Sequence, residues 1–299
     1  MIAADLVPHG PYSLRLSGRL ASDATRVVAN GSYRATIRVD GKLETVRAWQ
    51  RSDGVVCVRA ESEAGVEHVR YVLGLEDDHS EFLRRFAADP LLGEPIRRLR
   101  GLRPVRTATV AHALLRAVAG QLILAKRARE IERLIVRRST PALDGLHAAP
   151  SCADLGHFAP AELRDFGLGA RRGASLVRLC RSLELEKLKR LPTDAVARRL
   201  ERERGLGPWS VGVVCLEGLG RYERGLARDL GLVKLAAELW GRRVEAEETD
   251  ELLAPYAEWA GLASVYLLAG YHAGYLVLPD ADRDSRRRQD RRVAPRRAA

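Results

Sequence analysis

The residues best suited to chemistry lie between Arg204 and Lys234, in the run RGLGPWSVGVVCLEGLGRYERGLARDLGLVK. It holds a Gly-rich turn, an aromatic residue and a carboxylate, Asp229, about 22 residues after the turn. Asp229 precedes an apolar stretch, LGLVKLAAELWG, where Asp is a favoured helix N-cap. An isolated Asp at this position favours the capping role. A carboxylate can cap a helix and serve catalysis together, so both roles stay open.

The turn Gly205-Leu206-Gly207 and the following Pro208 predict a hairpin that leads into a helix. Glycines allow backbone angles that other residues resist, and proline suits the first position of a helix. The free N–H groups and positive dipole end of such a helix suit a phosphate. We expect Leu206 to anchor the hairpin in the core. The turn alone is equally compatible with an ordinary helix–turn–helix.

Four segments together resemble the helix-hairpin-helix superfamily of DNA glycosylases, and within it the DNA-3-methyladenine glycosylase II family. The segments are RGLGPWS, RDLGL, Gly120-Gln121-Leu122 and the run DFGLGARRGASL at 165–176. Their order and spacing agree with the family over roughly residues 75–275. The joint match is far more specific than any single piece.

The resemblance implies hydrolysis of the bond between an alkylated base and deoxyribose after the base is flipped out of the duplex. Asp229 would be the catalytic residue, stabilising positive charge on the sugar and activating or positioning water. Contacts to the DNA backbone fall to the hairpin and the start of its helix: Gly205, Leu206, Gly207, Pro208 and Ser210. Arg228 is expected to contact a phosphate rather than Asp229.

The same resemblance assigns a wedge and a base pocket. Leu122 would fill the gap left by the flipped nucleotide, with Gln121 as its polar partner, although helical periodicity alone favours a core position for Leu122. Trp209 would stack on the base, since an indole face attracts an electron-poor or cationic ring. Tyr271 and Trp259 match pocket positions too, and core packing is the alternative for each.

Two departures from relatives carry consequences. Relatives that also cut the strand have a Lys where Trp209 stands, and a Lys there forms a Schiff base with the sugar, whereas a Trp cannot. We therefore expect a monofunctional glycosylase without a lyase step. Relatives often read P-W-R-S where this chain has Gly261-Leu262-Ala263-Ser264, which leaves the substrate range and the local DNA contact open.

The elements that must position these residues predict an α+β fold, mainly α. Residues 1–76 are expected to form an antiparallel β-rich subdomain of about five strands, with turns at Asn30-Gly31 and Asp40-Gly41. Five segments show strand-like alternation: YSLRLSG, SYRATIRVDG, LETVRAWQ, GVVCVRAES and VEHVRYVLG. Residues 77–278 are expected to form an all-α helix-hairpin-helix glycosylase domain.

Within that domain the strongest helical region is 107–138, with a break at Gly120 to Ile123. Further helices are expected over 80–88, 160–185 in two parts, 193–204 and 257–276. Residues 279–299 are rich in Arg and almost free of apolar residues, so we expect a disordered tail that can add non-specific phosphate contacts.

The composition agrees with an anionic partner. The 299 residues carry a formal net charge of +11, although a genomic bias towards Arg could produce the same excess. The four cysteines, Cys57, Cys152, Cys180 and Cys215, have no metal-ligand spacing, so no metal or cofactor is expected. No signal peptide and no apolar run of membrane-spanning length is evident, which favours a cytoplasmic, nucleoid-associated monomer bound to damaged double-stranded DNA.

Two other functions remain open at this stage. The same fold can act on deaminated or oxidised bases. Alternatively, the chain is a non-catalytic protein that keeps the hairpin and binds DNA, although Asp229 and Trp209 argue against this. A purely structural helical protein would explain neither the charge nor the combined motif.

Overall fold

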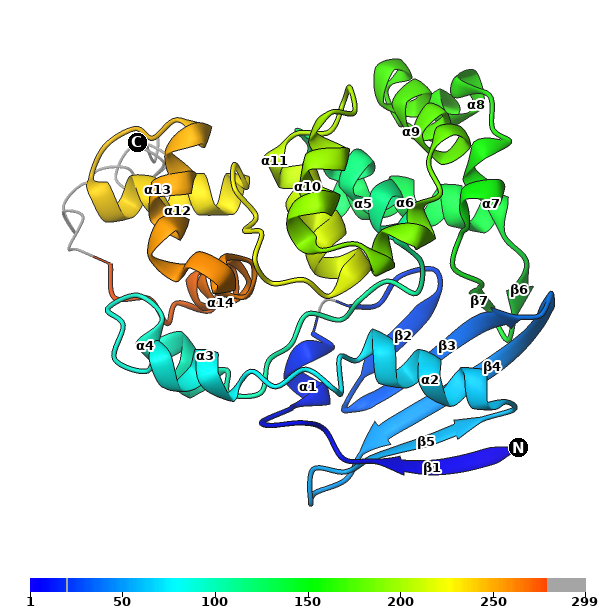
Figure 1. Ribbon diagram of the computed structural model, residues 1–299, viewed down its shortest axis with the longest axis horizontal. Helices are drawn as coiled ribbons and strands as arrows, with labels where there is room; N and C mark the ends of the chain where they lie inside the picture. The colour runs from blue at the N-terminus through cyan, green and yellow to red at the C-terminus, as the bar shows by residue number, and fades with distance from the viewer. Residues whose placement is uncertain (20, 279–299) are drawn as a thin grey trace, which may run out of the picture.

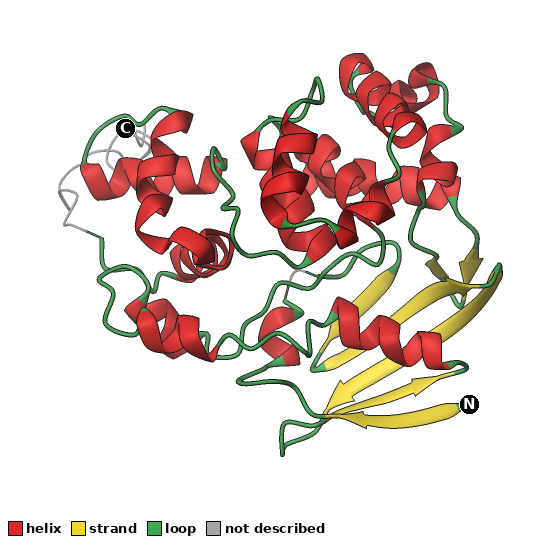
Figure 2. Ribbon diagram, viewed as in Figure 1, coloured by secondary structure: helices red, strands yellow, loops and turns green. Residues whose placement is uncertain are grey.

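An N-terminal sheet and a larger set of helices make up the protein, in a computed structural model that describes residues 1–19 and 21–278 (Figure 1). Figure 2 shows that the strands gather at one end and that helices fill the rest. The expected α+β fold, mainly α, is confirmed. The predicted disordered tail at 279–299 lies outside the described residues.

The elements of the N-terminal part are β1 (Ile2–Leu6), α1 (Leu14–Ser17), β2 (Arg26–Ala29), β3 (Ser32–Val39), β4 (Lys42–Gln50), β5 (Val56–Ala60) and α2 (Glu63–Val72). The helices that follow are α3 (Ser80–Arg85), α4 (Gly93–Arg98), α5 (Val110–Gly120), α6 (Ala125–Ser139), α7 (Cys152–Gly156), α8 (Pro160–Asp165), α9 (Ala170–Ser182), α10 (Thr193–Glu201), α11 (Pro208–Val213), α12 (Leu230–Trp240), α13 (Thr249–Leu253) and α14 (Ala260–Ala273). Shorter pieces are the hairpin β6 (Ala142–Leu143) and β7 (Leu146–His147), the 3-10 helices η1 (Leu185–Arg190), η3 (Ala246–Glu248) and η4 (Ala254–Trp259), and the π-helical turn η2 (Val214–Gly218).

The sheet is antiparallel throughout, with strand order β1-β5-β4-β3-β2. Both predicted turns are present: Asn30-Gly31 joins β2 to β3, and Asp40-Gly41 joins β3 to β4. All four turn residues have positive φ, as the tight turns favoured in hairpins require. The sheet and one helix, α2, enclose a separate buried cluster of apolar side chains.

Two of the five segments expected to be strands are helical instead. The segment at 12–18 contains α1, and the segment at 66–74 lies largely in α2, while β1 and β2 take the missing places in the sheet. Helix α2 begins at its N-cap Ser62 and buries Val66, Val69 and Val72. Their spacing of three residues places them on one helical face. The β-branched residues suggested a strand, but a helix buries all three against the sheet.

The helices form two groups around one continuous core (Figure 1). In the central group α5 packs against α6, α9 and α11, and its residues are buried nearly all round. In the second group α14 packs against α12 and α4. The predicted break between α5 and α6 is confirmed. The domain boundary at residue 76 stays a prediction, because Val105 also packs in the cluster beneath the sheet.

One helical stretch, Ala246–Ala273, is long and apolar enough to cross a membrane by length and composition, contrary to our expectation. More than half of its most apolar window is buried inside the protein. The stretch also changes direction at Ala257, whose φ is 43°. Its last part, α14, buries Leu262, Tyr266 and Leu267 in the helical core, so core packing accounts for its apolar character.

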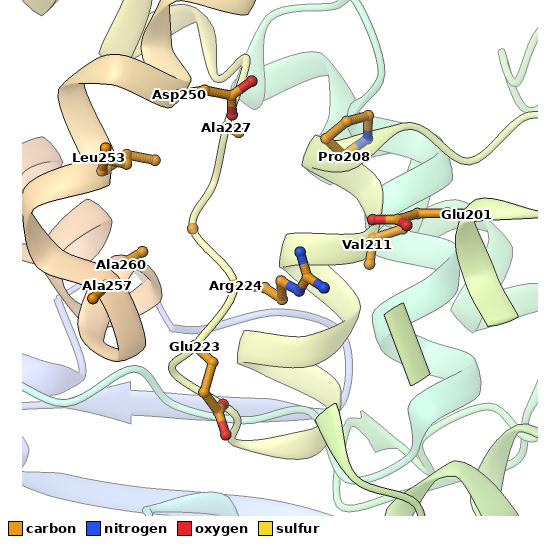
Figure 3. Close-up of a pocket in the computed structure, with 12 residues that line it drawn as sticks. Glu201, Pro208, Val211, Glu223, Arg224, Ala227, Asp250, Leu253, Ala257 and Ala260 are labelled. Atoms are coloured by element: carbon orange, nitrogen blue, oxygen red, sulfur yellow. The ribbon is translucent and has the colours of Figure 1, made fainter. Parts of the chain in front are cut away.

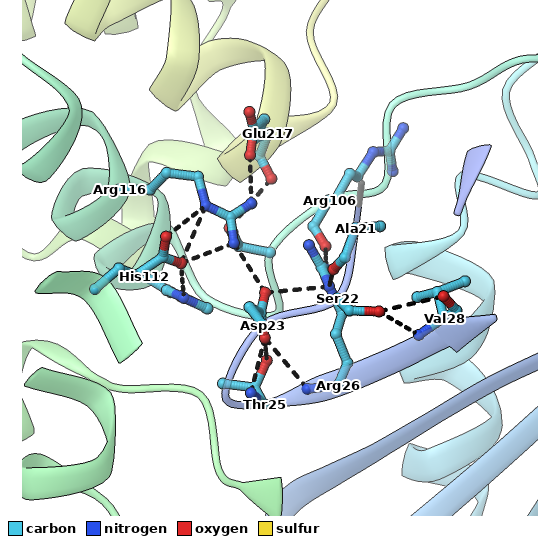
Figure 4. A network of polar contacts seen from close by, with 12 residues as sticks. Ala21, Ser22, Asp23, Thr25, Arg26, Val28, Arg106, His112, Arg116 and Glu217 are labelled. Atoms are coloured by element: carbon cyan, nitrogen blue, oxygen red, sulfur yellow. Dashed lines mark hydrogen bonds and ion pairs between the residues drawn. The ribbon is translucent and has the colours of Figure 1, made fainter. Parts of the chain in front are cut away.

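A buried network of charges joins the sheet to the central helices (Figure 4). Arg116 of α5 contacts Asp23 and Glu132 at 2.8 Å each and Glu217 at 2.6 Å. His112 Nε2 donates to Glu132 Oε1 at 2.7 Å. The ligand atoms of Asp23, His112 and Glu132 lie within 4.8 Å of one another, close enough for a metal site, but the Arg116 guanidinium already supplies the cation.

Candidate active site

The hairpin has the geometry that its glycines and proline predicted. Gly205 has a φ of 97°, and Gly207 is the N-cap of α11, with Pro208 as the first helical residue. Leu206 is only 7% exposed and packs in the helical core, which confirms its expected anchoring role. Arg178 of α9 donates to the Arg204 carbonyl at 2.9 Å and fixes the start of the turn.

Gln121 binds the hairpin directly. Its side-chain amide donates to the Gly205 carbonyl at 2.8 Å and to the Ser210 hydroxyl at 2.9 Å. Arg172 of α9 donates to the Gln121 carbonyl at 2.8 Å. The loop between α5 and α6 and the hairpin are therefore one connected structure, although they lie more than 80 residues apart in the sequence.

Leu122 stands at the tip of this connected structure, in solvent. Its side chain is 92% exposed, and its φ is 55°, an uncommon backbone conformation for a residue with a branched side chain. Leu124 in the same loop is 79% exposed. The core position that periodicity alone favoured for Leu122 is therefore wrong. An exposed apolar side chain on strained backbone is typical of a functional contact.

Asp229 is the N-cap of α12, and its carboxylate is held at both oxygens. Oδ1 accepts the Gly231 N–H at 2.7 Å, and Oδ2 accepts the indole N–H of Trp209 at 2.9 Å. The predicted cap is therefore present. The hydrogen bond to Trp209 was not predicted, because the two residues lie on separate elements. Within the described parts of the chain Asp229 forms no ion pair, so its charge is available to a cation.

Arg228 does not contact Asp229. Its guanidinium lies 3.2 Å from Glu247, and both side chains are largely exposed. Its backbone has a φ of 68°, and its N–H donates to the Thr249 hydroxyl at 2.7 Å. This left-handed residue turns the chain so that Asp229 can begin α12. Leu122 and Arg228 thus place strained backbone on two elements of the same site.

The two aromatic residues expected beside Trp209 have different surroundings. Tyr271 of α14 donates to Glu238 of α12 at 2.7 Å, and Leu268, one turn earlier on α14, lies against Gly231. Tyr271 is therefore attached to the helix that Asp229 caps. Trp259 packs against Phe82 and His79 instead, with ring centroids 5.7 and 6.4 Å apart. These ring contacts favour the core-packing alternative for Trp259, and its assignment to the pocket wall stays a prediction.

Close backbone packing holds Asp229 near α11. A Cβ at Gly212 would lie 2.4 Å from the Gly225 carbonyl oxygen, so the chain leading to Asp229 passes directly against the helix that carries Trp209. The segment Gly261-Leu262-Ala263-Ser264, which departs from P-W-R-S, forms hydrogen bonds to the stretch that leads to Asp229. Ser264 accepts the Leu226 N–H at 3.0 Å, and Gly261 donates its N–H to Tyr222 at 2.7 Å, which a proline could not do.

A cleft of about 220 Å³ lies between the two groups of helices (Figure 3). Pro208 and Val211 line one side, and Leu253 and Ala260 line the other. Its charged residues are mostly acidic, and neither Asp229 nor Trp209 belongs to its lining. The candidate active site is therefore the region around Asp229 and Trp209, and it is separate from the lining of this cleft.

No family model matches this chain, but curated proteins described as DNA repair enzymes are similar to it in sequence. A DNA-3-methyladenine glycosylase of Bacillus subtilis is 24% identical over 81% of this chain and 84% of its own length. A Mycobacterium tuberculosis protein described as a probable bifunctional transcriptional activator/DNA repair enzyme AlkA is 26% identical over 89% of this chain. The chain spans about half the length of that protein, 56%.

Solved structures share the fold over nearly the whole chain. A 3-methyladenine DNA glycosylase from Archaeoglobus fulgidus superimposes with a TM-score of 0.78 and 23% identity, covering 93% of this chain and 100% of that one. An 8-oxoguanine glycosylase/lyase of Clostridium acetobutylicum, solved with double-stranded DNA, gives a TM-score of 0.72 and 18% identity, covering 91% and 97%. This shared fold, together with the hairpin, the capping aspartate and the relatives, supports the resemblance to the helix-hairpin-helix superfamily of DNA glycosylases.

Proposed function

We propose that this protein is a monofunctional DNA glycosylase that removes alkylated bases of the 3-methyladenine type in base excision repair. The observation that carries the proposal is the state of Asp229. Its carboxylate is oriented by two neutral N–H donors, from Trp209 and Gly231, and has no cationic partner among the residues described. A carboxylate held in this way can face a cation that forms only during a reaction.

The reaction would break the bond between the base and C1′ of deoxyribose. As the base leaves, positive charge develops on the sugar, and the Asp229 carboxylate stabilises it. Water then adds to C1′ and loses a proton, with Asp229 as the group that positions it. An alkylated purine suits this route because its positive charge makes it a good leaving group. The glycosylase named from Bacillus subtilis supports this substrate class.

DNA would bind along the side of the molecule that carries the hairpin and the Leu122 loop. The exposed backbone of Gly205 and Gly207 offers contacts to phosphates, and Ser210 anchors the turn through Gln121. Leu122 would enter the stack in place of the flipped nucleotide, since its exposed apolar side chain loses water there. Trp209 and Tyr271 would accept the base. We propose a monomer acting on nucleoid DNA in the cytoplasm.

The residue at position 209 excludes one further step in this proposal. A strand-cutting glycosylase needs an amine that attacks C1′, and the Trp209 indole carries no such nucleophile. The product would therefore be an intact strand with an abasic site. Borohydride trapping should yield no covalent complex between the protein and lesion DNA, and a trapped complex would contradict the proposal.

The decisive experiment uses duplex oligonucleotides that each carry one lesion: 3-methyladenine or a stable analogue, hypoxanthine, 1,N6-ethenoadenine and 8-oxoguanine. Each is incubated with the wild type and with Asp229→Asn, and abasic sites are then cleaved with alkali. We expect cleavage of the alkylated substrate only after alkali and only with the wild type. Binding of all four without cleavage would indicate a non-catalytic DNA-binding protein. Cleavage of 8-oxoguanine or hypoxanthine alone would move the substrate to oxidised or deaminated bases.

A further inference from the structure

The indole of Trp209 spans the distance between the Leu122 loop and the catalytic carboxylate. Its five-membered ring donates the Nε1 proton to Asp229 Oδ2 at 2.9 Å. Its six-membered ring lies against Gly120, where an added Cβ would be only 2.6 Å from Cη2. The two contacts fall at opposite ends of one rigid ring. A shift at the end of α5 therefore reaches Asp229 without passing through a flexible side chain.

Gly120 is directly followed by the loop that is expected to meet DNA. Gln121 holds the hairpin on both sides of Trp209, through the Gly205 carbonyl and the Ser210 hydroxyl. Leu122 follows at once, with strained backbone and an exposed side chain. An insertion of Leu122 into a duplex must therefore exert force on Gly120 and Gln121. Gly120 contacts the Trp209 ring, and Gln121 contacts the hairpin before it.

We infer that Trp209 is a positioning residue that links the seating of the Leu122 loop to the orientation of the Asp229 carboxylate. This inference rests on the proposed function and deepens it. Trp209 would do more than stack on a base, because its N–H fixes the oxygen of Asp229 that the helix cap leaves free. Gly120 belongs to the same link, because any side chain at position 120 would displace the Trp209 indole.

The two oxygens of Asp229 are held in different ways, and this difference makes the link effective. Oδ1 is bound by Gly231, two residues further on in the same chain segment, so it moves with α12. Oδ2 is bound by Trp209 of α11, so its position depends on a separate element. Loss of the second bond frees the carboxylate to rotate about the first.

The test compares Trp209→Phe, Gly120→Ala and the double variant in single-turnover excision of an alkylated base. Trp209→Phe keeps an aromatic face but loses the N–H, so we expect the single-turnover rate to fall about 10- to 100-fold while the affinity for DNA with an abasic site stays unchanged. Gly120→Ala should lower the rate by pushing the indole. The double variant should be no slower than Trp209→Phe, because the smaller phenyl ring leaves room for the methyl group.

Trp49→Phe provides a matched control, because it removes an indole from the exposed face of the sheet, where Arg59 lies over the ring at 5.4 Å. It should leave the rate and the affinity for abasic DNA unchanged. The melting temperature of each variant shows whether a loss of rate is a loss of folding. Additive effects of Trp209→Phe and Gly120→Ala would overturn the inference, as would a loss of rate in Trp209→Phe that is matched by an equal loss of affinity for abasic DNA.

Fluorescence separates this inference from the proposed function, because it needs no activity. The indole emission should differ between the wild type and Asp229→Ala, because that variant removes the acceptor of the Trp209 N–H. Gly120→Ala should change the emission as well, and in a Trp209→Phe background neither substitution should change it further. If the wild type excises no lesion, the proposed function fails, and the emission still decides whether Trp209 joins Gly120 to Asp229. An unchanged emission in Gly120→Ala would contradict the link.

Discussion

Two groups of carboxylates in this protein have opposite surroundings. At the junction of the sheet and the helices, Asp23 and Glu132 are almost fully buried and are bound by Arg116, with Glu217 as a third partner of the same guanidinium. At the candidate active site, Asp229 is half-exposed, and among the described residues its carboxylate is bound by neutral N–H groups alone. The first group is already neutralised by cations, while the second keeps its charge available.

The protein thus uses carboxylates for stability at the junction and for chemistry at the candidate active site. Burial alone would raise the pKa of Glu132, but Arg116 and the hydrogen bond from His112 outweigh it and lower the pKa to about 2. The pKa of Asp23 is lowered as well, because the charges of Arg26, His112 and Arg116 outweigh the effect of burial. A carboxylate so strongly paired cannot stabilise a transient cation. Changes at the junction should therefore affect folding, and changes at the site should affect activity.

The largest effect is expected for Asp229→Asn. The variant keeps an N-cap for α12, since Asn caps helices about as well as Asp, but it loses the negative charge. We expect the excision rate to fall by about 10³-fold, a loss in the range measured when one preorganised electrostatic group is removed. Single-turnover rates and thermal melting measure the two properties side by side. A variant that melts well below the wild type would mean that Asp229 is chiefly a structural residue.

Arg116→Met should have the converse effect. It leaves Asp23, Glu132 and Glu217 without their shared cation, and breaking a buried ion pair in this way costs about 3–5 kcal/mol of folding free energy. Urea unfolding at pH 7 measures the loss. The fraction that remains folded should excise the lesion at the wild-type rate. Arg127→Met serves as the control, because Glu130 is the one ion-pair partner of Arg127 over residues 1–19 and 21–278, and both side chains are exposed.

The Leu122 loop offers a second case in which activity and stability separate. Leu122→Ala removes a side chain that buries almost nothing in the free protein, so the stability should change by less than about 0.5 kcal/mol. Excision from duplex DNA should fall about 10- to 100-fold, because nothing fills the gap in the stack. Excision from a single-stranded oligonucleotide should change little. An equal loss on both substrates would show that Leu122 is not a wedge.

The stability that the buried Glu132 carboxylate contributes should depend on pH. Because the pKa of Glu132 is lowered from 4.5 to about 2, its contribution is fully present above pH 4.5 and is lost as the pH falls towards 2. The slope can reach roughly 1.4 kcal/mol per pH unit for each such carboxylate. The contribution of this pair to the urea midpoint should therefore be similar at pH 7 and pH 4.5 and smaller at pH 3. Glu132→Gln should be less stable at pH 7 and show a shallower drop, whereas an unchanged slope would contradict the pairing.

Local signals were enough to predict the parts of the site that lie on one segment. Gly205, Leu206 and Pro208 specify the hairpin through backbone angles and capping, and the position of Asp229 before an apolar run specifies its cap. The break between α5 and α6 was visible as well. These features depend on residues within a few positions of one another, so a sequence carries them directly.

Contacts between distant segments could not be obtained in this way. The bond from Trp209 to Asp229 and the contact between Trp209 and Gly120 depend on how three helices pack. Trp259 shows the same limit, because its match to a pocket position could not reveal the rings of Phe82 and His79 beside it. In the N-terminal part, β-branched residues indicated strands at 66–74, where packing against the sheet selects α2.

The smallest effect is expected at Arg228, where the site meets an exposed ion pair. If Arg228 contacts a phosphate, DNA must displace its partner Glu247, which lies 3.2 Å away. Arg228→Ala should weaken lesion binding about threefold and reduce the slope of log affinity against log salt by about one, while the single-turnover rate stays the same. Glu247→Gln should strengthen binding, because it removes the competitor. Arg242→Ala, which breaks the nearby pair with Glu248, is the control and should change neither property. If Arg228→Ala raised the rate without weakening binding, Arg228 would act by opposing the charge of Asp229, and the site would resemble the buried network more closely than its contacts indicate.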